Sequence, residues 1–292
     1  MWALTPLPPG SWDSHMHVTD PANYPLTKDA LYTPKPHLLP EALAFEASIG
    51  IQNIVLVQPS IYGTDNTCML NALRTLGPRH GRAVVTFDPE TITSATLRDW
   101  HKLGVRGVRV NTQSVGRHMS DEELVTTLHR YADIIRPLDW VLQLYVPLAT
   151  ATVLEKVVPE LGVRVCLDHF GAPDPRDLFL YSNSSGGGGG PYSLPGFASL
   201  VNLLRVGNTY IKLSAPYRMS GDGMLRDLEP VAKEILRVAG MDRAVFASDW
   251  PHTRFEGLDI RPFMETLLDW CGRDQVLIER VFRANAETLW GV

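Results

Sequence analysis

The hydrophobic positions of this chain fall into two alternating patterns. Short runs such as IVLVQ at 54–58 and VVTF at 84–87 are continuously apolar, which is typical of parallel strands covered on their outer face by helices. Eight such runs predict strands at 12–17, 51–58, 82–87, 105–111, 141–146, 163–169, 210–213 and 244–248.

Between these runs, apolar residues recur at helical spacing. The segments concerned are 39–48, 66–76, 120–136, 149–161, 196–205, 224–238 and 260–271. Ser120 followed by Glu123 is the capping-box signature of a helix start. Eight strands alternating with helices predict an α/β fold, a (β/α)8 TIM barrel forming a single domain over residues 1–292. A doubly wound open sheet is the alternative, although no GxGxxG follows the first strand.

One segment interrupts this pattern, the NSSGGGGG of residues 183–190. Five consecutive glycines do not hold one conformation cheaply, so we expect a flexible loop over 182–191. Because it follows the sixth strand, it belongs to a loop on the face where barrels carry their active sites. It is either a tolerated insertion or a mobile lid.

Composition narrows the class of protein. The chain is 45% hydrophobic and 20% charged with a net charge of −5, which argues against nucleic-acid and membrane-surface partners. The three cysteines are far apart and show no CxxC pattern, so we expect no disulfide framework and a reducing compartment. No signal peptide and no apolar run of membrane-spanning length is recognisable, which predicts a cytoplasmic protein. The oligomeric state is left open.

Candidate chemistry begins in the first strand, with SWDSHMHVTD at 11–20. Side chains two apart in a strand share a face, so Asp13, His15 and His17 are expected to point into the barrel together. An isolated HxH is a weak signal. Polar residues at the other strand ends strengthen it: Arg109, Asn111, Tyr145, Asp168, His169, Lys212, Ser214, Tyr217, Arg218, Asp249 and His252. Of these, Asp168 is expected to face outward.

The motifs HMH at 15–17, DHFG at 168–171 and SDWPH at 248–252 resemble the amidohydrolase superfamily. The likeness is to the amidohydrolase-2 branch, which contains 2-pyrone-4,6-dicarboxylate lactonases. LYTP with Tyr32, VQPSIYGTDN with Ser60 and GVRGVRVN with Arg109 agree as well. The resemblance extends over nearly the whole chain with its motifs in the same order.

The resemblance implies a role for each matching residue. Asp249 resembles the general base that activates water, and His15, His17 and His169 resemble the group that polarises the scissile carbonyl. The residues resembling those that hold substrate carboxylates are Tyr32, Ser60, Arg109, Arg117, Tyr145 and Arg218, with the spacing to Arg117 two residues longer than in the family. The expected enzyme is a hydrolase of aromatic catabolism that reversibly opens a carboxylated lactone such as 2-pyrone-4,6-dicarboxylate.

Many members of the superfamily bind zinc, and their ligands include a lysine on the fourth strand and a histidine on the fifth. This chain lacks that lysine and has Tyr145 in place of that histidine, so a two-metal site is excluded. One zinc held by His15, His17, His169 and Asp249 is chemically possible. We expect a metal-free site, as the resemblance implies. The alternatives are a metal-dependent decarboxylase of an aromatic acid, a sugar lactonase, and an inactive barrel that binds a carboxylated metabolite.

Overall fold

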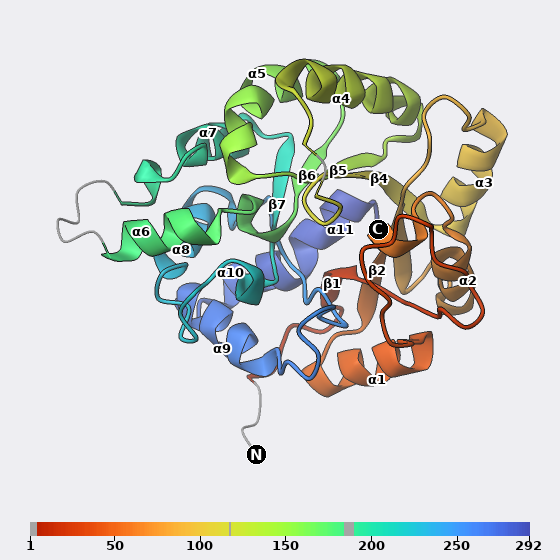
Figure 1. Ribbon diagram of the computed structural model, residues 1–292. Coiled ribbons are helices and arrows are strands. Elements are labelled where there is room, and N and C mark those ends of the chain that lie inside the picture. Colours follow the sequence, from red (N-terminus) through yellow and green to blue (C-terminus); the bar gives the residue numbers. More distant parts are fainter. Residues whose placement is uncertain (1–4, 117, 184–189) are drawn as a thin grey trace.

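The computed structural model describes residues 5–116, 118–183 and 190–292. Its centre is one sheet of eight parallel strands that lie side by side in sequence order (Figure 1). The strands are β1 (Trp12–Met16), β2 (Asn53–Val57), β3 (Gly81–Val85), β4 (Val105–Asn111), β5 (Val141–Tyr145), β6 (Val165–Leu167), β7 (Thr209–Leu213) and β8 (Ala244–Phe246). The backbone of Asp249 donates to His15 O at 2.9 Å, which joins the segment after β8 to β1. The predicted (β/α)8 barrel is confirmed.

Helices surround this barrel. They are α1 (Leu39–Ile49), α2 (Thr67–Leu76), α3 (Ser94–Leu103), α4 (Asp121–Ile135), α5 (Ala151–Leu161), α6 (Pro175–Asn183), α7 (Phe197–Val206), α8 (Glu229–Ala239), α9 (Arg261–Trp270), α10 (Gln275–Glu279) and α11 (Asn285–Trp290). The predicted helices all occur with small shifts of their ends, whereas α3, α6, α10 and α11 were not predicted. At α4 the expected capping box forms, because Glu123 N donates to Ser120 Oγ at 3.2 Å and Ser120 N donates to Glu123 Oε2 at 2.9 Å.

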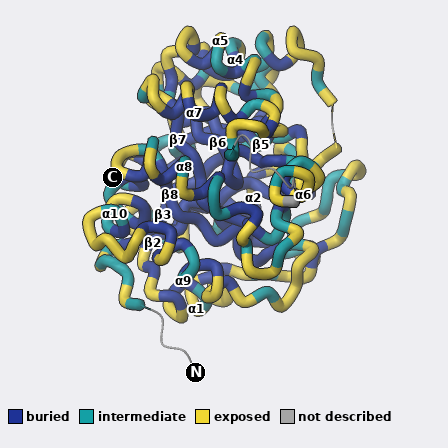
Figure 2. The backbone as a smooth tube through the Cα atoms, turned by 90° about the vertical axis from the view of Figure 1, so that its left-hand side faces the viewer, coloured by how far each residue is buried: buried dark blue, intermediate teal, exposed yellow. Residues whose placement is uncertain are grey.

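Two apolar layers follow from the alternation of side chains along each strand. Residues such as Leu56 and Leu142 point outward into the layer beneath the helices. Their neighbours Val55 and Val141 point inward, into a smaller cluster that contains Trp290 of α11. The buried residues accordingly concentrate at the centre of the molecule and the exposed ones on the surrounding elements (Figure 2).

The first strand departs from regular alternation. Its register with β2 shifts between Asp13 and Met16, as in a β-bulge. Ser14 accepts a hydrogen bond from Trp290 Nε1 at 3.1 Å inside the barrel, whereas Asp13 lies against Glu46 of α1. The expectation that Asp13 shares a face with His15 and His17 is therefore wrong, because the bulge turns the strand between these positions.

Three further expectations concern the whole chain. Cys68, Cys166 and Cys271 are buried and unpaired, as the sequence predicts. Within the described ranges, no helix combines the length and the apolar character needed to cross a membrane. The predicted flexible loop at 182–191 contains residues 184–189, which lie outside the described residues, so its role as a lid stays a prediction.

Candidate active site

Three histidine rings surround one carboxylate oxygen at the carboxyl end of the barrel. The Nε2 atoms of His15, His17 and His169 lie 3.7, 3.6 and 3.9 Å from Asp249 Oδ1. All four side chains are buried. The four residues predicted as the catalytic group, which come from β1 and from the segments after β1, β6 and β8, are thus brought together.

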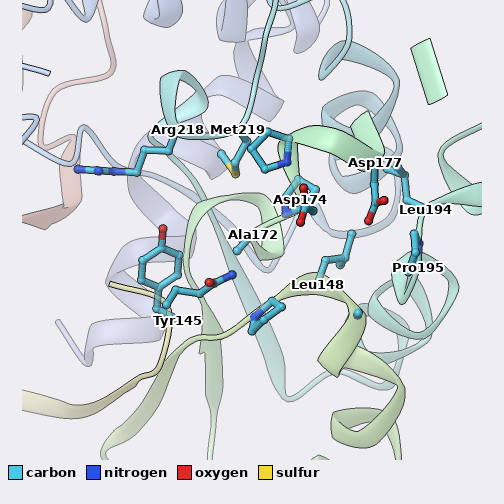
Figure 3. Close-up of a pocket in the computed structure, with 14 residues that line it drawn as sticks. Tyr145, Leu148, Ala172, Asp174, Asp177, Leu194, Pro195, Arg218 and Met219 are labelled. Atoms are coloured by element: carbon cyan, nitrogen blue, oxygen red, sulfur yellow. The ribbon is translucent and has the colours of Figure 1, made fainter. Parts of the chain in front are cut away.

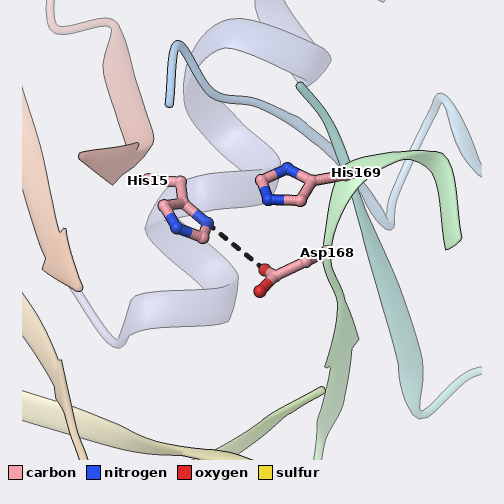
Figure 4. Close-up of side chains that lie close together, drawn as sticks. All are labelled: His15, Asp168 and His169. Carbon is pink, nitrogen blue, oxygen red and sulfur yellow. Dashed lines mark ion pairs between the residues drawn. The ribbon is translucent and has the colours of Figure 1, made fainter. Parts of the chain in front are cut away.

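The backbone at two of these positions is unusual. His169 has φ 52° and Asp249 has φ 62°, a left-handed conformation that is uncommon for residues other than glycine. At His169 it breaks the alternation of the preceding strand, so that Asp168 and His169 both point into the barrel (Figure 4). The expectation that Asp168 faces outward is wrong for this reason.

Each ring is oriented through its Nδ1 atom. His17 Nδ1 lies 2.7 Å from Val57 O, and because a carbonyl only accepts, Nδ1 carries a hydrogen. His169 Nδ1 lies 2.7 Å from Ser214 Oγ. Burial lowers the pKa of His169 to about 4 and the pKa of His15 well below its usual range. These two rings are therefore neutral at physiological pH.

Asp249 is ionised and held by one of its two oxygens. Its Oδ2 accepts from Arg218 Nε at 2.8 Å and from Tyr217 Oη at 2.7 Å, and Arg218 Nη2 forms an ion pair with it at 2.8 Å. Burial alone would raise the pKa of Asp249. The nearby Arg218 and His169 lower it by more than burial raises it, so the pKa of Asp249 lies well below its usual range. Oδ1 is left facing the three Nε2 atoms.

A second buried carboxylate, Asp168, lies beside His15 (Figure 4). Its Oδ2 accepts from Arg109 Nε and from Gln143 Nε2, both at 3.0 Å, and Arg109 Nη2 forms an ion pair with it at 2.9 Å. Its Oδ1 lies 3.3 Å from both Lys212 Nζ and His15 Nδ1. Burial would raise the pKa of Asp168, yet Lys212, His15 and Arg109 lower it well below its usual range.

A cleft with a volume of about 400 Å³ opens above this group. Five of the six predicted substrate-binding residues line it: Tyr32, Ser60, Arg109, Tyr145 and Arg218. The sixth, Arg117, lies outside the described residues. Arg254 also lines the cleft and was not predicted, and its Cζ lies 4.6 Å from the centroid of the Tyr32 ring.

A second cleft of about 880 Å³ adjoins the first, and the two share Tyr145 and Arg218 (Figure 3). Away from these two side chains it is lined by Asp174 and Asp177 together with Leu194. The catalytic cleft therefore continues into a larger hollow beside the barrel mouth.

The donor set fits a single metal ion. Histidine nitrogen and carboxylate oxygen suit zinc, and tetrahedral bonds of about 2.0–2.1 Å separate ligand atoms by about 3.4 Å. The separations of 3.6–3.9 Å around Asp249 Oδ1 are close to this value, and the buried His15 Nε2 has no hydrogen-bond partner. Ligand atoms of His15, His17 and Asp249 lie within 4.8 Å of one another, whereas His169 forms such a group with His15 and Asp168 instead. A bridged pair of metals is not supported, because Arg109 and Tyr145 replace the lysine and histidine that it requires.

Comparison with known proteins agrees with the motifs. Residues 12–292 match the model of the amidohydrolase family described as "Amidohydrolase". The chain is 30% identical to 4-sulfomuconolactone hydrolase of Hydrogenophaga intermedia over 98% of this chain and 90% of the relative. It is 29% identical to a 2-pyrone-4,6-dicarboxylate hydrolase of Comamonas testosteroni, over 84% of this chain and 78% of the relative.

A solved structure from Pseudomonas putida, described as a 2-pyrone-4,6-dicarboxylic acid hydrolase, is 29% identical to this chain. It superposes with a TM-score of 0.79, covering 97% of each chain. The match of the family model extends from the first strand to residue 292 and includes Asp249 and the three histidines around it. The chain therefore belongs to the amidohydrolase family.

Proposed function

We propose that the protein is a lactonase, which reversibly hydrolyses the cyclic ester of a carboxylated lactone such as 2-pyrone-4,6-dicarboxylate. The observation that carries the proposal is Asp249 itself, an ionised carboxylate with one oxygen fixed and the other facing three imidazoles at the base of a cleft. The names of two relatives, a sulfomuconolactone hydrolase and a pyrone-dicarboxylate hydrolase, support the same reaction class.

Ring opening needs a water molecule, a base and stabilisation of the developing oxyanion. Asp249 Oδ1 accepts a proton as water attacks the carbonyl carbon, and the bond between that carbon and the ring oxygen then breaks. The ring oxygen takes the proton back from Asp249 and leaves as the hydroxyl or enol of the product. His15, His17 and His169 surround the position of the carbonyl, where one well-placed donor lowers the barrier by about 3 kcal/mol.

The cleft presents the groups that an anionic substrate needs. Tyr32, Ser60 and Tyr145 offer hydroxyl groups, and guanidinium groups supply local positive charge although the whole chain carries a net charge of −5. Arg109 and Arg218 already donate through Nε to Asp168 and Asp249, and Nη2 of each lies 2.8–2.9 Å from the same carboxylate. Their role toward substrate is therefore limited to the remaining N–H groups and to the field of their charge.

We infer that the enzyme works without a metal, because a lactone is an activated ester and needs less polarisation than an amide. One ion at His15, His17, His169 and Asp249 would supply Lewis-acid polarisation of the carbonyl when bound. We further propose that the enzyme is cytoplasmic and that it acts in the catabolism of aromatic compounds.

Turnover and metal content decide between these possibilities. We expect purified protein to open 2-pyrone-4,6-dicarboxylate, followed by its ultraviolet absorbance, with less than about 0.1 metal per chain by mass spectrometry and with activity that resists chelator. Near one zinc per chain and loss of activity on chelation would contradict the metal-free mechanism. Decarboxylation of an aromatic acid without lactone opening would contradict the proposed reaction as well.

A further inference from the structure

Three guanidinium groups line the catalytic cleft in the described ranges, and they differ in their partners. Arg109 is bound to Asp168 and Arg218 is bound to Asp249, at distances of 2.8–3.0 Å. Arg254 has no carboxylate within 4 Å among the described residues. Among the described arginines of this cleft, it is thus the one whose charge no carboxylate balances.

The local structure holds Arg254 over the cleft. Its backbone adopts φ 70°, a conformation that costs a non-glycine residue free energy and that often occurs at functional sites. Its Cζ lies 4.6 Å from the centroid of the Tyr32 ring, a cation–π contact that restrains the side chain. The nearest acid in sequence, Glu256, pairs with Lys35 at 2.7 Å.

The other two arginines are poorly placed to serve as the main anion receptors. If Arg218 turned its fork to a substrate, Asp249 would lose the cation that keeps its pKa low. If Arg109 did so, Asp168 would remain buried without that partner, and an unpaired buried charge is costly. Arg254 can bind an anion without breaking any ion pair of the protein.

We propose that Arg254 binds the anionic group of the substrate that is remote from the scissile carbonyl, a ring carboxylate or sulfonate, and so selects charged lactones over neutral ones. The inference rests on the proposed lactonase function for the identity of the substrate. The anion lies between the Arg254 guanidinium, which offers two parallel N–H groups, and the hydroxyl groups of Tyr32 and Ser60 on the same cleft.

Kinetics with a charged and a neutral substrate test this role. We expect Arg254→Gln to lower kcat/KM for 2-pyrone-4,6-dicarboxylate by about 10- to 100-fold, mainly through KM, because a charge-assisted hydrogen bond is lost. The same variant should change kcat/KM for the neutral 4,6-dicarboxamide by less than about 3-fold. Arg254→Lys, which keeps the charge but not the fork, should recover part of the loss.

The matched control is Arg226→Gln, because Arg226 is an exposed arginine that pairs with Asp222 at 2.7 Å. It should leave both substrates unaffected. Equal losses on the charged and the neutral substrate, or no loss on either, would show that Arg254 does not recognise the anion.

A binding measurement separates this inference from the lactonase proposal. Calorimetric titration with pyridine-2,4-dicarboxylate, a planar dianion without a lactone, should show about 10- to 100-fold weaker binding to Arg254→Gln than to the unmodified protein. If the dianion binds through Arg254 but no lactone is opened, the proposed function fails and the anion site stands. If the unmodified protein does not bind the dianion, or the variant binds it equally well, the inference is wrong.

Discussion

Two buried aspartates, each paired with an arginine, lie on either side of His15 and have opposite surroundings. Oδ2 of Asp168 accepts hydrogen bonds from Arg109 and Gln143, and its Oδ1 lies 3.3 Å from Lys212 Nζ and His15 Nδ1 without a hydrogen bond. Asp249 is fixed only through Oδ2, and it lines the cleft. The pKa of each carboxyl lies well below its usual range, so pKa alone does not separate them. Position in the cleft does, since Asp249 lines the cleft in which water and substrate would meet and Asp168 does not.

Of the substitutions that test this difference between the two aspartates, Asp249→Asn has the largest expected effect, a loss of activity. The amide cannot act as the base, so we expect kcat on the lactone to fall by about 10³-fold or more. The melting temperature should change by only a few degrees, because Tyr217 and Arg218 are close to the surface of the cleft rather than sealed in the barrel. Steady-state rates and differential scanning calorimetry measure the two effects. Retention of more than a tenth of the activity would remove Asp249 as the base.

Asp168→Asn should mainly affect the fold. It leaves Arg109 and Lys212 buried beside a neutral amide, and breaking a buried ion pair in this way costs about 3–5 kcal/mol of unfolding free energy. Urea unfolding followed by tryptophan fluorescence measures the loss. Asp259→Asn is the control, because Asp259 pairs with Arg261 on the surface and such pairs contribute about 0–1 kcal/mol. Equal stabilities of the two variants would break the contrast between the aspartates.

A smaller effect is expected at Glu46, a third buried carboxyl, which lies against Asp13 behind β1. Burial and then Asp13 raise the pKa of Glu46 well above its usual range. The folded protein therefore keeps this proton while the unfolded chain loses it above about pH 4.5. Stability linked to Glu46 is fully present below that pH and is lost as pH rises toward the folded-state pKa.

Glu46→Gln removes this dependence. We expect its melting temperature to match that of the unmodified protein near pH 4.5 and to exceed it by about 2–4 °C at pH 8. Glu122→Gln, at an exposed position of α4, serves as the control. Parallel pH profiles for the unmodified protein and Glu46→Gln would show that Glu46 is ionised in the fold.

The barrel and its catalytic group were predictable because each depends on a short-range pattern. Continuous apolar runs mark buried parallel strands, and HMH, DHFG and SDWPH mark three strand ends. Helix α3 was not predicted although Leu97, Trp100 and Leu103 recur at helical spacing, because only Leu97 is fully buried and the other two pack against the core from partly exposed positions.

The pairing of charges could not be read from sequence. Arg109 was predicted to bind substrate, but its guanidinium group donates to Asp168, which lies 59 positions later in the chain. These two residues become neighbours only when the barrel has formed. The bulge in β1 and the left-handed backbone at His169 each reverse an inference that assumed regular alternation. Arg254 was missed for a similar reason, because nothing in the letters HTRFE indicates a positive φ that turns its side chain over Tyr32.

The position of α11 has a consequence for how the protein is made. Trp290 fills the inner cluster with Val55 and Val141, and Arg164 donates to the carbonyls of Thr288 and Leu289 at 2.8 and 2.9 Å. Lys212 lies 5.4 Å from the centroid of the Trp290 ring, so this helix also closes the chamber that holds the Asp168 charges. During synthesis the eight strands leave the ribosome before residues 285–290 do, and the interior of the barrel therefore stays unfilled until this helix has been made.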